Sequence, residues 1–243
     1  VTSPAKSIRQ EQDSAFLRIN DTPVYFQEDW NTGIGGGLWS TGLAFARYLE
    51  HHSQHALSSL DALNDHEKKL SLLELGSGNG FLAICMLALC KDIWNEFVVT
   101  DVESHLDLIE TTLNANPHLV GDTNVTVMQH LWGEFHPSTD SYSCSIQNEV
   151  NNGTFKFDVI IGSDVAYRQE LYDPLISSLK QFSHAKTVCL IGVTMNDTRP
   201  QFFHKLREAG FRYERLADWL LEPEYRGNTF GIFVIQQKVS TWQ

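Results

Sequence analysis

The sequence predicts an α/β fold in which a doubly wound, mostly parallel seven-stranded sheet ends in an antiparallel hairpin. From Leu70 onward, short apolar segments typical of strands alternate with segments of helical periodicity. Such alternation forms a parallel sheet with helices on both faces. A glycine-rich loop separates the first of these strands from its helix. The last two strand-like segments have no helix between them, which favours an antiparallel pair.

The N-terminal part of the chain precedes this alternation. The length of 243 residues fits one α/β domain with short extensions. We assign residues 1–32 to an N-terminal extension and residues 33–243 to the main domain. Residues 1–14 are polar and expected to be loose, whereas Phe16–Gln27 alternates apolar and polar side chains around a turn, which predicts a small hairpin.

The segment before the sheet contains a loop, a helix and a connection. Gly33–Gly37 is expected to form a flexible, hinge-like loop. Leu38–His52 has the apolar periodicity of a helix. The polar stretch 51–69 is predicted to be a connection with one weak helical turn.

The remaining elements follow from the same periodicities. The sequence predicts strands at about 71–75, 97–101, 124–129, 157–163 and 187–193, and helices at about 80–91, 104–115, 168–182 and 199–209. Two further strand-like segments at 211–216 and 228–238 make the C-terminal hairpin. The polar stretch 133–156 is predicted to be a surface insertion.

The charge balance bears on the kind of partner. The chain has 18 basic and 30 acidic residues, a net charge of −12, and no basic run. This composition argues against a nucleic-acid partner, because a phosphate backbone is bound by clustered Lys and Arg. An acidic protein suits a basic substrate segment, although solubility alone explains the charge equally well.

Apolar runs and cysteines predict the compartment. The apolar run Phe81–Cys90 is too short to cross a bilayer, and no signal peptide is visible, so we expect no membrane association. Cys85, Cys90 and Cys189 lie in apolar runs and are expected to be reduced core residues. We therefore expect a cytoplasmic monomer, with the nucleus as a further location.

The glycine loop carries the main chemical signal. Gly76, Gly78 and Gly80 follow the spacing G-x-G-x-G, and Phe81 stands where a dinucleotide site has its third glycine. Glu74 lies directly before the loop, where a carboxylate would repel phosphates but could meet a cationic or amine-bearing ligand. These features point to S-adenosyl-L-methionine, which has an adenosine, a sulfonium and an amino-acid tail but no phosphate.

Two carboxylates follow later strands. Asp101 ends the second strand of the sheet, where a carboxylate can accept from two adjacent ribose hydroxyls; the alternative is a helix N-cap. Asp164 follows the fourth strand, and Tyr167 comes three residues later, so both are predicted at the mouth of the ligand cleft. The alternative for this pair is a helix cap and a packed ring.

Two tryptophans are candidates for contact with the ligand. Trp132 precedes a glycine after the third strand and could stack on adenine, although a core position is equally compatible with the local sequence. Trp39 is expected on a helix face in the core, unless Gly33–Gly37 folds over the ligand. The scattered histidines lack metal-ligand spacing, so no metal site is predicted.

The segment Leu72–Gly80 resembles the first motif of seven-β-strand S-adenosylmethionine-dependent methyltransferases. More specifically, the chain resembles the methyltransferase-like protein lysine methyltransferases, which combine an upstream tryptophan, Trp-Gly after the third strand and Asp-x-x-Tyr after the fourth. Here Trp39, Trp132 and the segment 164–167 match these motifs. Segments 99–103 and 224–226 look most like the branch that methylates the AAA ATPase valosin-containing protein.

The resemblance implies a Rossmann-like methyltransferase domain and a site. The implied cofactor is S-adenosyl-L-methionine, with S-adenosyl-L-homocysteine as its product. The implied cofactor-binding residues are Trp39, Glu74, Gly76, Gly78, Gly80, Asp101, Trp132 and Ser163. Asp164 and Tyr167 are implied to face the target lysine.

The implied activity is a protein-lysine N-methyltransferase acting on a non-histone protein, with an AAA ATPase, an elongation factor or a chaperone as candidate substrates. Segments 134–156 and 194–200 depart from the branch and leave the substrate open. The alternatives are an inactive adenosylmethionine-binding protein, or a methyltransferase acting on another protein nitrogen or a small molecule.

Overall fold

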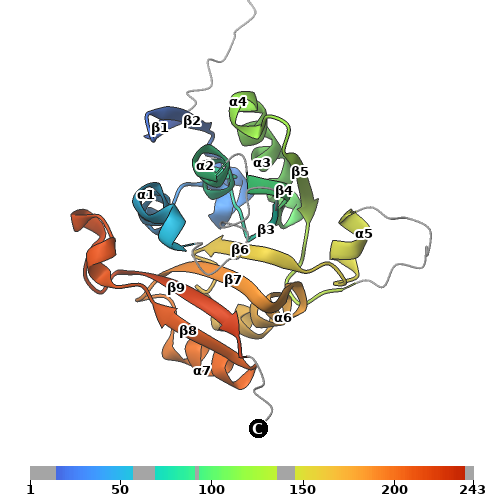
Figure 1. Ribbon diagram of the computed structural model, residues 1–243, viewed down its shortest axis with the longest axis vertical. Helices are drawn as coiled ribbons and strands as arrows, with labels where there is room; N and C mark the ends of the chain where they lie inside the picture. The colour runs from blue at the N-terminus through green and yellow to red at the C-terminus, as the bar shows by residue number, and fades with distance from the viewer. Residues whose placement is uncertain (1–14, 57–68, 91–92, 136–145, 239–243) are drawn as a thin grey trace, which may run out of the picture.

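The computed structural model describes residues 15–56, 69–90, 93–135 and 146–238. Seven strands form one sheet in the order β5-β4-β3-β6-β7-β9-β8 (Figure 1). The strands are β3 (Leu70–Leu75), β4 (Trp94–Asp101), β5 (Asn124–Gln129), β6 (Phe157–Ser163), β7 (Ser183–Thr194), β8 (Phe211–Arg215) and β9 (Phe230–Gln237). The first five in this order pair in parallel, whereas β9 is antiparallel to both β7 and β8. The predicted doubly wound sheet with a C-terminal antiparallel hairpin is therefore confirmed.

Helices cover both faces of the sheet. On one face lie α1 (Ser40–Ala56), α2 (Phe81–Cys90) and α3 (Glu103–Ala115), and on the other lie α6 (Tyr172–Phe182) and α7 (Pro200–Glu208) (Figure 1). The short helices α4 (Pro117–Val120) and α5 (Ile146–Asn151) complete the α-helices among the described residues, and α5 lies in the predicted insertion.

The core lies on both sides of the sheet. All six residues of β3 are buried; Leu72 belongs to the cluster packed under α1, α2 and α3, whereas Leu73 and Leu75 belong to the cluster under α6 and α7. Successive side chains of a strand point to opposite faces, so a strand covered twice must be apolar throughout. This explains why the other residues of β3 are all leucine, with Ser71 and Glu74 as its two polar residues.

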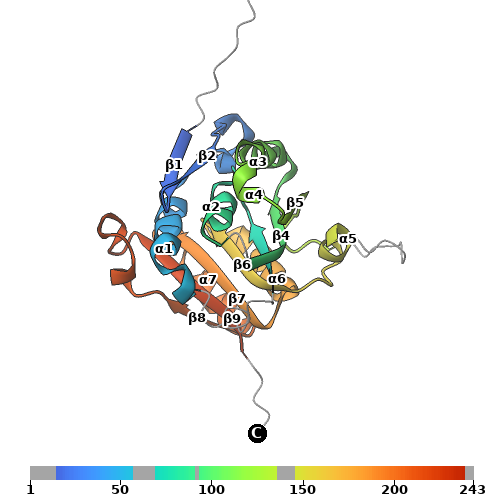
Figure 2. The ribbon, with the colours of Figure 1, turned by 45° about the horizontal axis from the view of Figure 1, so that its top comes forward.

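The predicted N-terminal hairpin is present as β1 (Ala15–Ile19) and β2 (Thr22–Phe26). It lies beside α2 and α3 (Figure 2), and the Phe26 ring packs edge-on against Phe81 with centroids 5.1 Å apart. The Asn116 side chain accepts from the Tyr25 N–H at 2.9 Å and donates to the Tyr25 carbonyl. The hairpin thus contributes to the same core as the first helical layer.

Some boundaries differ from the predictions. Helix α1 begins at Ser40, so Trp39 precedes it, and α6 begins at Tyr172 after a short 3-10 helix, Gln169–Leu171. Strand β7 is longer than predicted because its first residue, Ser183, pairs with Phe157 of β6 and its last residue, Thr194, pairs with Phe230 of β9. Residues 51–56 of the predicted connection 51–69 instead continue α1 to Ala56. The predicted loose residues 1–14, and residues 57–68 of that connection, lie outside the described residues.

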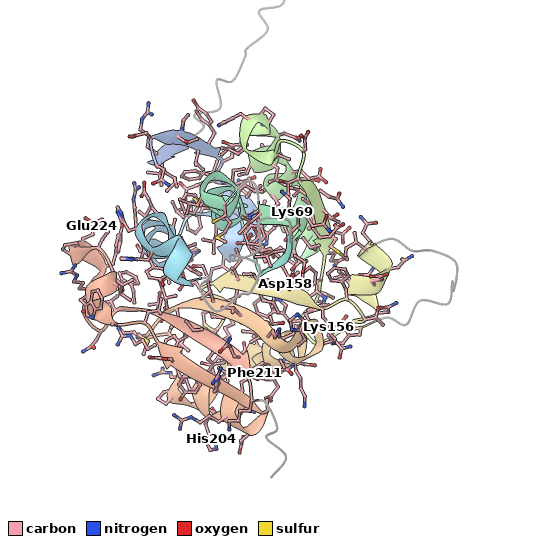
Figure 3. All side chains as sticks on the ribbon, viewed as in Figure 1. Lys69, Lys156, Asp158, His204, Phe211 and Glu224 are labelled. Carbon is pink, nitrogen blue, oxygen red and sulfur yellow. The ribbon has the colours of Figure 1, made fainter. Side chains whose placement is uncertain are left out.

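Polar contacts at the amino ends of the strands have a structural role. Asp158, labelled in Figure 3, accepts from the backbone N–H and the hydroxyl of Ser71 at 2.9 Å each, and so joins β6 to β3.

His204, also labelled in Figure 3, lies on the outer side of α7 and contacts Glu208. Among the described residues, no helix is long and apolar enough to span a membrane.

Candidate functional site

A cavity of about 850 Å³ lies at the carboxyl ends of β3, β4, β5 and β6. Strand β3 lies between β4 and β6, so the winding direction of the sheet reverses beside it. Open α/β sheets bind ligands at such a reversal, because the following loops diverge there. The lining includes all of the predicted site residues except Gly80, namely Trp39, Glu74, Gly76, Gly78, Asp101, Trp132, Ser163, Asp164 and Tyr167.

Gly80 lies outside this cavity. Its backbone N–H donates to the Ser77 carbonyl at 3.2 Å, and its φ is 79°. A Cβ there would lie 3.3 Å from Cβ of Thr112 on α3. The structure therefore gives Gly80 a role in packing α2 against α3, in place of the predicted contact with the ligand.

Gly76 and Gly78 form the floor of the cavity. Both have left-handed backbones, with φ of 66° and 63°. A Cβ on Gly76 would lie 2.9 Å from the Trp132 ring, and a Cβ on Gly78 would lie 2.5 Å from the carbonyl oxygen of Gly35. The glycines therefore allow both the tryptophan and the segment 33–37 to approach the loop closely.

The segment 33–37 lies over the glycine loop, and two hydrogen bonds to its backbone carbonyls hold it in place. The Asp29 N–H donates to the Gly36 carbonyl at 2.7 Å, and Nε1 of Trp39 donates to the Ile34 carbonyl at 2.9 Å. The Trp39 ring is 42 % exposed and stands edge-on to Trp30. The expectation that Trp39 is a core residue is therefore wrong, and the alternative, that it lines the cleft once Gly33–Gly37 folds over it, holds.

Glu74 is a buried carboxyl at the end of β3. Its side chain is 1 % exposed, and Oε2 accepts from the Ser77 hydroxyl at 2.7 Å. Burial, together with the negative charge of Asp101, raises the pKa of Glu74 to about 8, although the Ser77 hydroxyl opposes the shift. A cation in the cavity would stabilise the ionised form, so the site is suited to a positively charged ligand.

Asp101 organises the next strand end. Its Oδ2 accepts from the Gly78 N–H at 2.7 Å, and its Oδ1 accepts from the Val102 N–H at 2.7 Å and lies 2.8 Å from Nδ1 of His105. The N-cap of α3 is Val102, without a side-chain capping bond, so Asp101 is not the predicted cap. A carboxylate offers about four lone-pair positions, so room remains for a ligand donor.

The sequence reasoning missed His105. This side chain is 6 % exposed, lines the cavity beneath Gly33 and Gly35, and leaves Nε2 without a hydrogen-bond partner. The hydrogen bond to Asp101 raises the pKa of His105, although burial opposes this shift. The available signal was its position in the first turn of the helix that follows Asp101, four residues after this carboxylate.

Trp132 is held by a buried polar contact behind it. Oγ of Ser178 accepts from the Gly133 N–H at 2.9 Å and lies 2.9 Å from Nε2 of His130. Burial lowers the pKa of His130 to about 4, so this ring is neutral at physiological pH. The neutral pair fixes the loop and keeps the half-buried Trp132 ring against Gly76.

Asp164 has an unusual conformation and one unpaired oxygen. Its φ is 55°, in the left-handed region, and its N–H donates to the Gly192 carbonyl at 2.9 Å. Oδ1 accepts from the N–H and the hydroxyl of Thr194, whereas the buried Oδ2 has no partner. Burial raises the pKa of Asp164, and the Thr194 hydrogen bonds oppose the shift. Because α6 begins eight residues later, Asp164 is not its cap.

Tyr167 and Ser163 complete this wall. Tyr167 also lines a smaller polar pocket of about 400 Å³ that shares Asp197 with the main cavity. The Arg168 guanidinium lies 5.5 Å from the Tyr167 ring centroid. Oγ of Ser163 is buried without a partner. The described residues contain no group of three or more potential metal ligands.

Comparison with known proteins gives a family and relatives. The model of a family described as lysine methyltransferase matches residues 18–209. "Protein N-lysine methyltransferase METTL21A" of Danio rerio is 24 % identical over 207 residues, covering 84 % of this chain and 82 % of the relative. "Protein-lysine N-methyltransferase EFM3" of Saccharomyces cerevisiae is 24 % identical over 187 residues, covering 74 % of this chain but only 49 % of the relative, about half its length.

Solved structures agree with the fold alone. The methyltransferase domain of bacterial CtHen1 aligns with a TM-score of 0.50 at 12 % identity, covering 77 % of this chain and 99 % of that one. An O-methyltransferase family protein from Burkholderia thailandensis aligns with a TM-score of 0.50 at 13 % identity, covering 83 % of this chain and 60 % of that one.

Proposed function

The chain belongs to the lysine methyltransferase family and depends on S-adenosyl-L-methionine, and on this premise we propose that it methylates a lysine of a non-histone protein, with the target amine held at Asp164. The observation that carries the proposal is the buried, unpartnered Oδ2 of Asp164 in the same cavity as Glu74. The cavity thus has one carboxyl for a cationic cofactor and a second for a cationic substrate.

The residues present fit the cofactor. The glycine loop leaves room for close backbone approach, which a ligand without phosphates and with an amino-acid tail can use. We assign the cofactor ammonium to Glu74, the ribose hydroxyls to Asp101 and the adenine face to Trp132. The unpartnered Oγ of Ser163 and the exposed Trp39 ring complete the lining.

When bound, S-adenosyl-L-methionine supplies a methyl group already activated by its sulfonium, so the protein needs to supply position and a neutral amine. A lysine side chain has a pKa of about 10.4, and deprotonating it near neutral pH costs roughly 4 kcal/mol. The charge of Asp164 favours the ammonium form, whereas desolvation favours the amine. Asp164 therefore captures and orients the nitrogen, and Tyr167 narrows the approach to it.

The substrate protein is a further part of the proposal. An AAA ATPase, an elongation factor or a chaperone is the candidate class, in line with the resemblance of the motifs. The polar pocket beside Tyr167 would meet residues next to the target lysine, because it adjoins the main cavity.

The function is tested by labelled methyl transfer from S-adenosyl-L-methionine into a cell extract, followed by mass spectrometry of the labelled band. Methyl-lysine in one or a few proteins, suppressed by excess S-adenosyl-L-homocysteine, is the expected result. Label on histidine, on an N-terminal amine or on a small molecule would contradict the lysine assignment. Cofactor binding without transfer into any extract would instead support the inactive binding protein.

The buried Glu74 makes cofactor binding pH-dependent. Because its pKa is about 8 in the free protein, the carboxyl is mostly protonated at pH 6–7 and must lose its proton to pair with a cation. The affinity for the cofactor should therefore rise by up to about tenfold per pH unit between pH 6 and 7. In this range the α-amine of the cofactor stays protonated, because a free α-amine has a pKa of about 7.7. Calorimetry in two buffers of different ionisation enthalpy should show close to one proton released.

Glu74→Gln is the matching variant, because glutamine keeps the shape but cannot ionise. It should bind the cofactor more weakly and with no proton release. Since the folded pKa of Glu74 is raised, its contribution to stability is present at low pH and lost as pH rises from 4.5 through about 8. The free energy of unfolding of cofactor-free Glu74→Gln should therefore not show this decline with pH. Equal proton release by both proteins would contradict the role of Glu74.

A further inference from the structure

We infer that Thr41 and Thr194 are positioning residues, forming a hydrogen-bond relay that aims the free oxygen of Asp164 into the cavity. The inference rests on the proposed role of Asp164 as the group that holds the target amine. Thr41 is the second residue of α1 and Thr194 is the last residue of β7, so the relay joins two distant parts of the chain.

The contacts form a continuous series. The Thr194 backbone N–H and Oγ1 lie 3.2 Å and 2.9 Å from Oδ1 of Asp164. Oγ1 of Thr41 lies 2.8 Å from Oγ1 of Thr194, and the Thr41 side chain is 1 % exposed. Neither threonine lines the cavity, so neither can meet the substrate directly.

The hydrogen bonds in this series all run in the same direction, with each hydroxyl donating toward Asp164. An ionised carboxylate only accepts hydrogen bonds, so the Thr194 hydroxyl donates its single proton to Asp164. The oxygen of Thr194 is then free to accept, and the Thr41 hydroxyl must donate to it. Removal of the Thr41 hydroxyl would leave the Thr194 oxygen buried with one partner fewer.

The relay makes the two carboxylate oxygens unequal. Oδ1 receives both donors and Oδ2 receives none, so the carboxylate plane is fixed with Oδ2 free for a cation from the cavity. Asp164 also has a left-handed backbone that side chains rarely adopt, which the surrounding bonds must maintain. Thr194 is therefore suited to hold both the backbone turn and the side-chain direction.

The relay also favours the charged form of Asp164. Burial raises the pKa of this carboxyl, and the negative charge of Asp197 on the turn after β7 adds to the rise. The hydrogen bonds from Thr194, and the Thr41 hydroxyl behind them, act in the opposite sense. Toward α1 and β7 the contacting groups are thus two hydroxyls, and the ionisable side chains that line the cavity from the loop after β6 and the turn after β7 are Tyr167, Arg168 and Asp197.

The position of Thr41 links this relay to the cofactor side. Thr41 follows Trp39 by two residues, and Trp39 lines the cavity and binds the carbonyl of Ile34. A shift at the start of α1 would therefore reach both the segment 33–37 and Asp164.

The test compares Thr41→Val, Thr41→Ser and Thr194→Val with the wild type. Valine keeps the shape without the hydroxyl, whereas serine keeps the hydroxyl. Thr194→Val should lower kcat by about tenfold to a hundredfold, a loss typical of a misplaced catalytic group. Thr41→Val should lower it less, and Thr41→Ser should restore it. The acidic limb of the kcat/KM profile should move to higher pH in both valine variants, and the cofactor Kd should stay unchanged in Thr194→Val.

Thr187→Val is the matched control. Thr187 is a fully buried threonine of the same strand, β7, and its hydroxyl donates to the Phe157 carbonyl at the amino end of β6, away from the cavity. The variant Thr187→Val should be less stable than the wild type, but its kcat/KM profile should not shift with pH. If the Thr41 and Thr194 variants lose only stability, as Thr187→Val does, the relay is overturned. If Asp164→Asn itself retains wild-type turnover, the proposed function of Asp164 fails instead, so the two failures are distinguishable.

Discussion

Asp164→Asn is expected to lower kcat for lysine methylation by about a hundredfold or more, because a misplaced or unpaired reacting group costs at least that factor. Asparagine has nearly the same shape but no charge, so it cannot attract the lysine ammonium to the position of Oδ2. Because the cofactor contacts are assigned to Glu74 and Asp101 on β3 and β4, and Asp164 is assigned to the substrate amine, the cofactor Kd should change by less than about threefold, roughly 0.7 kcal/mol.

Two measurements separate these effects: calorimetric titration with S-adenosyl-L-homocysteine, and initial rates of methyl transfer into the substrate protein. Asp173→Asn is the matched control, since Asp173 pairs with Lys205 on the exposed side of α6. The control should retain wild-type rates and affinity. An equal loss of cofactor affinity and turnover in Asp164→Asn would refute the proposed division of roles.

The second large effect is expected for Gly78→Ala. A Cβ at this position would lie 2.5 Å from the carbonyl oxygen of Gly35, which is backbone and cannot rotate away. The substitution should push the segment 33–37 off the glycine loop and disturb the bond from the Gly78 N–H to Asp101. We expect cofactor affinity to fall by about 30- to 100-fold, roughly 2–3 kcal/mol.

Gly210→Ala is the control for backbone strain alone. Gly210 has a φ of 92°, and a Cβ there would meet nothing within 4 Å. An alanine in the left-handed region costs roughly 1–2 kcal/mol wherever it occurs. Both variants should therefore unfold at lower temperature, but only Gly78→Ala should bind the cofactor weakly in calorimetry. If Gly210→Ala weakens binding as much, strain and not closure of the loop explains the effect.

The fold was largely predictable because its signals are local. The apolar run of β3 ending in Glu74, and the helix starting at Phe81, are visible as periodicities, and the structure has both. The parallel pairing of the sheet follows from alternation, since parallel strands need crossover helices. Boundaries were less predictable where pairing decides them, as in β7, whose first residue Ser183 pairs with Phe157 of β6.

The cavity-lining residues were predictable for the same reason. Glu74, Asp101 and Asp164 stand at the ends of strands, and parallel strands bring their carboxyl ends together at one edge. Gly80 was predicted with its neighbours because a loop motif does not reveal which glycine faces a ligand and which faces a helix. The position of Trp39 depended on how the segment 33–37 folds, for which sequence periodicity gives no signal.

The sequence by itself determined the α/β class, the order of strands and helices, the glycine loop and the family motifs. These features depend on neighbours close along the chain or on the general geometry of parallel sheets. Only the tertiary structure decided that His105 contacts Asp101 beneath the segment 33–37, and that Thr41 supports Thr194 behind Asp164. Thr41 and Thr194 are 153 positions apart in sequence, and no local pattern specifies which buried hydroxyl meets which. Such contacts arise from the packing of α1 against the sheet, which requires the whole fold.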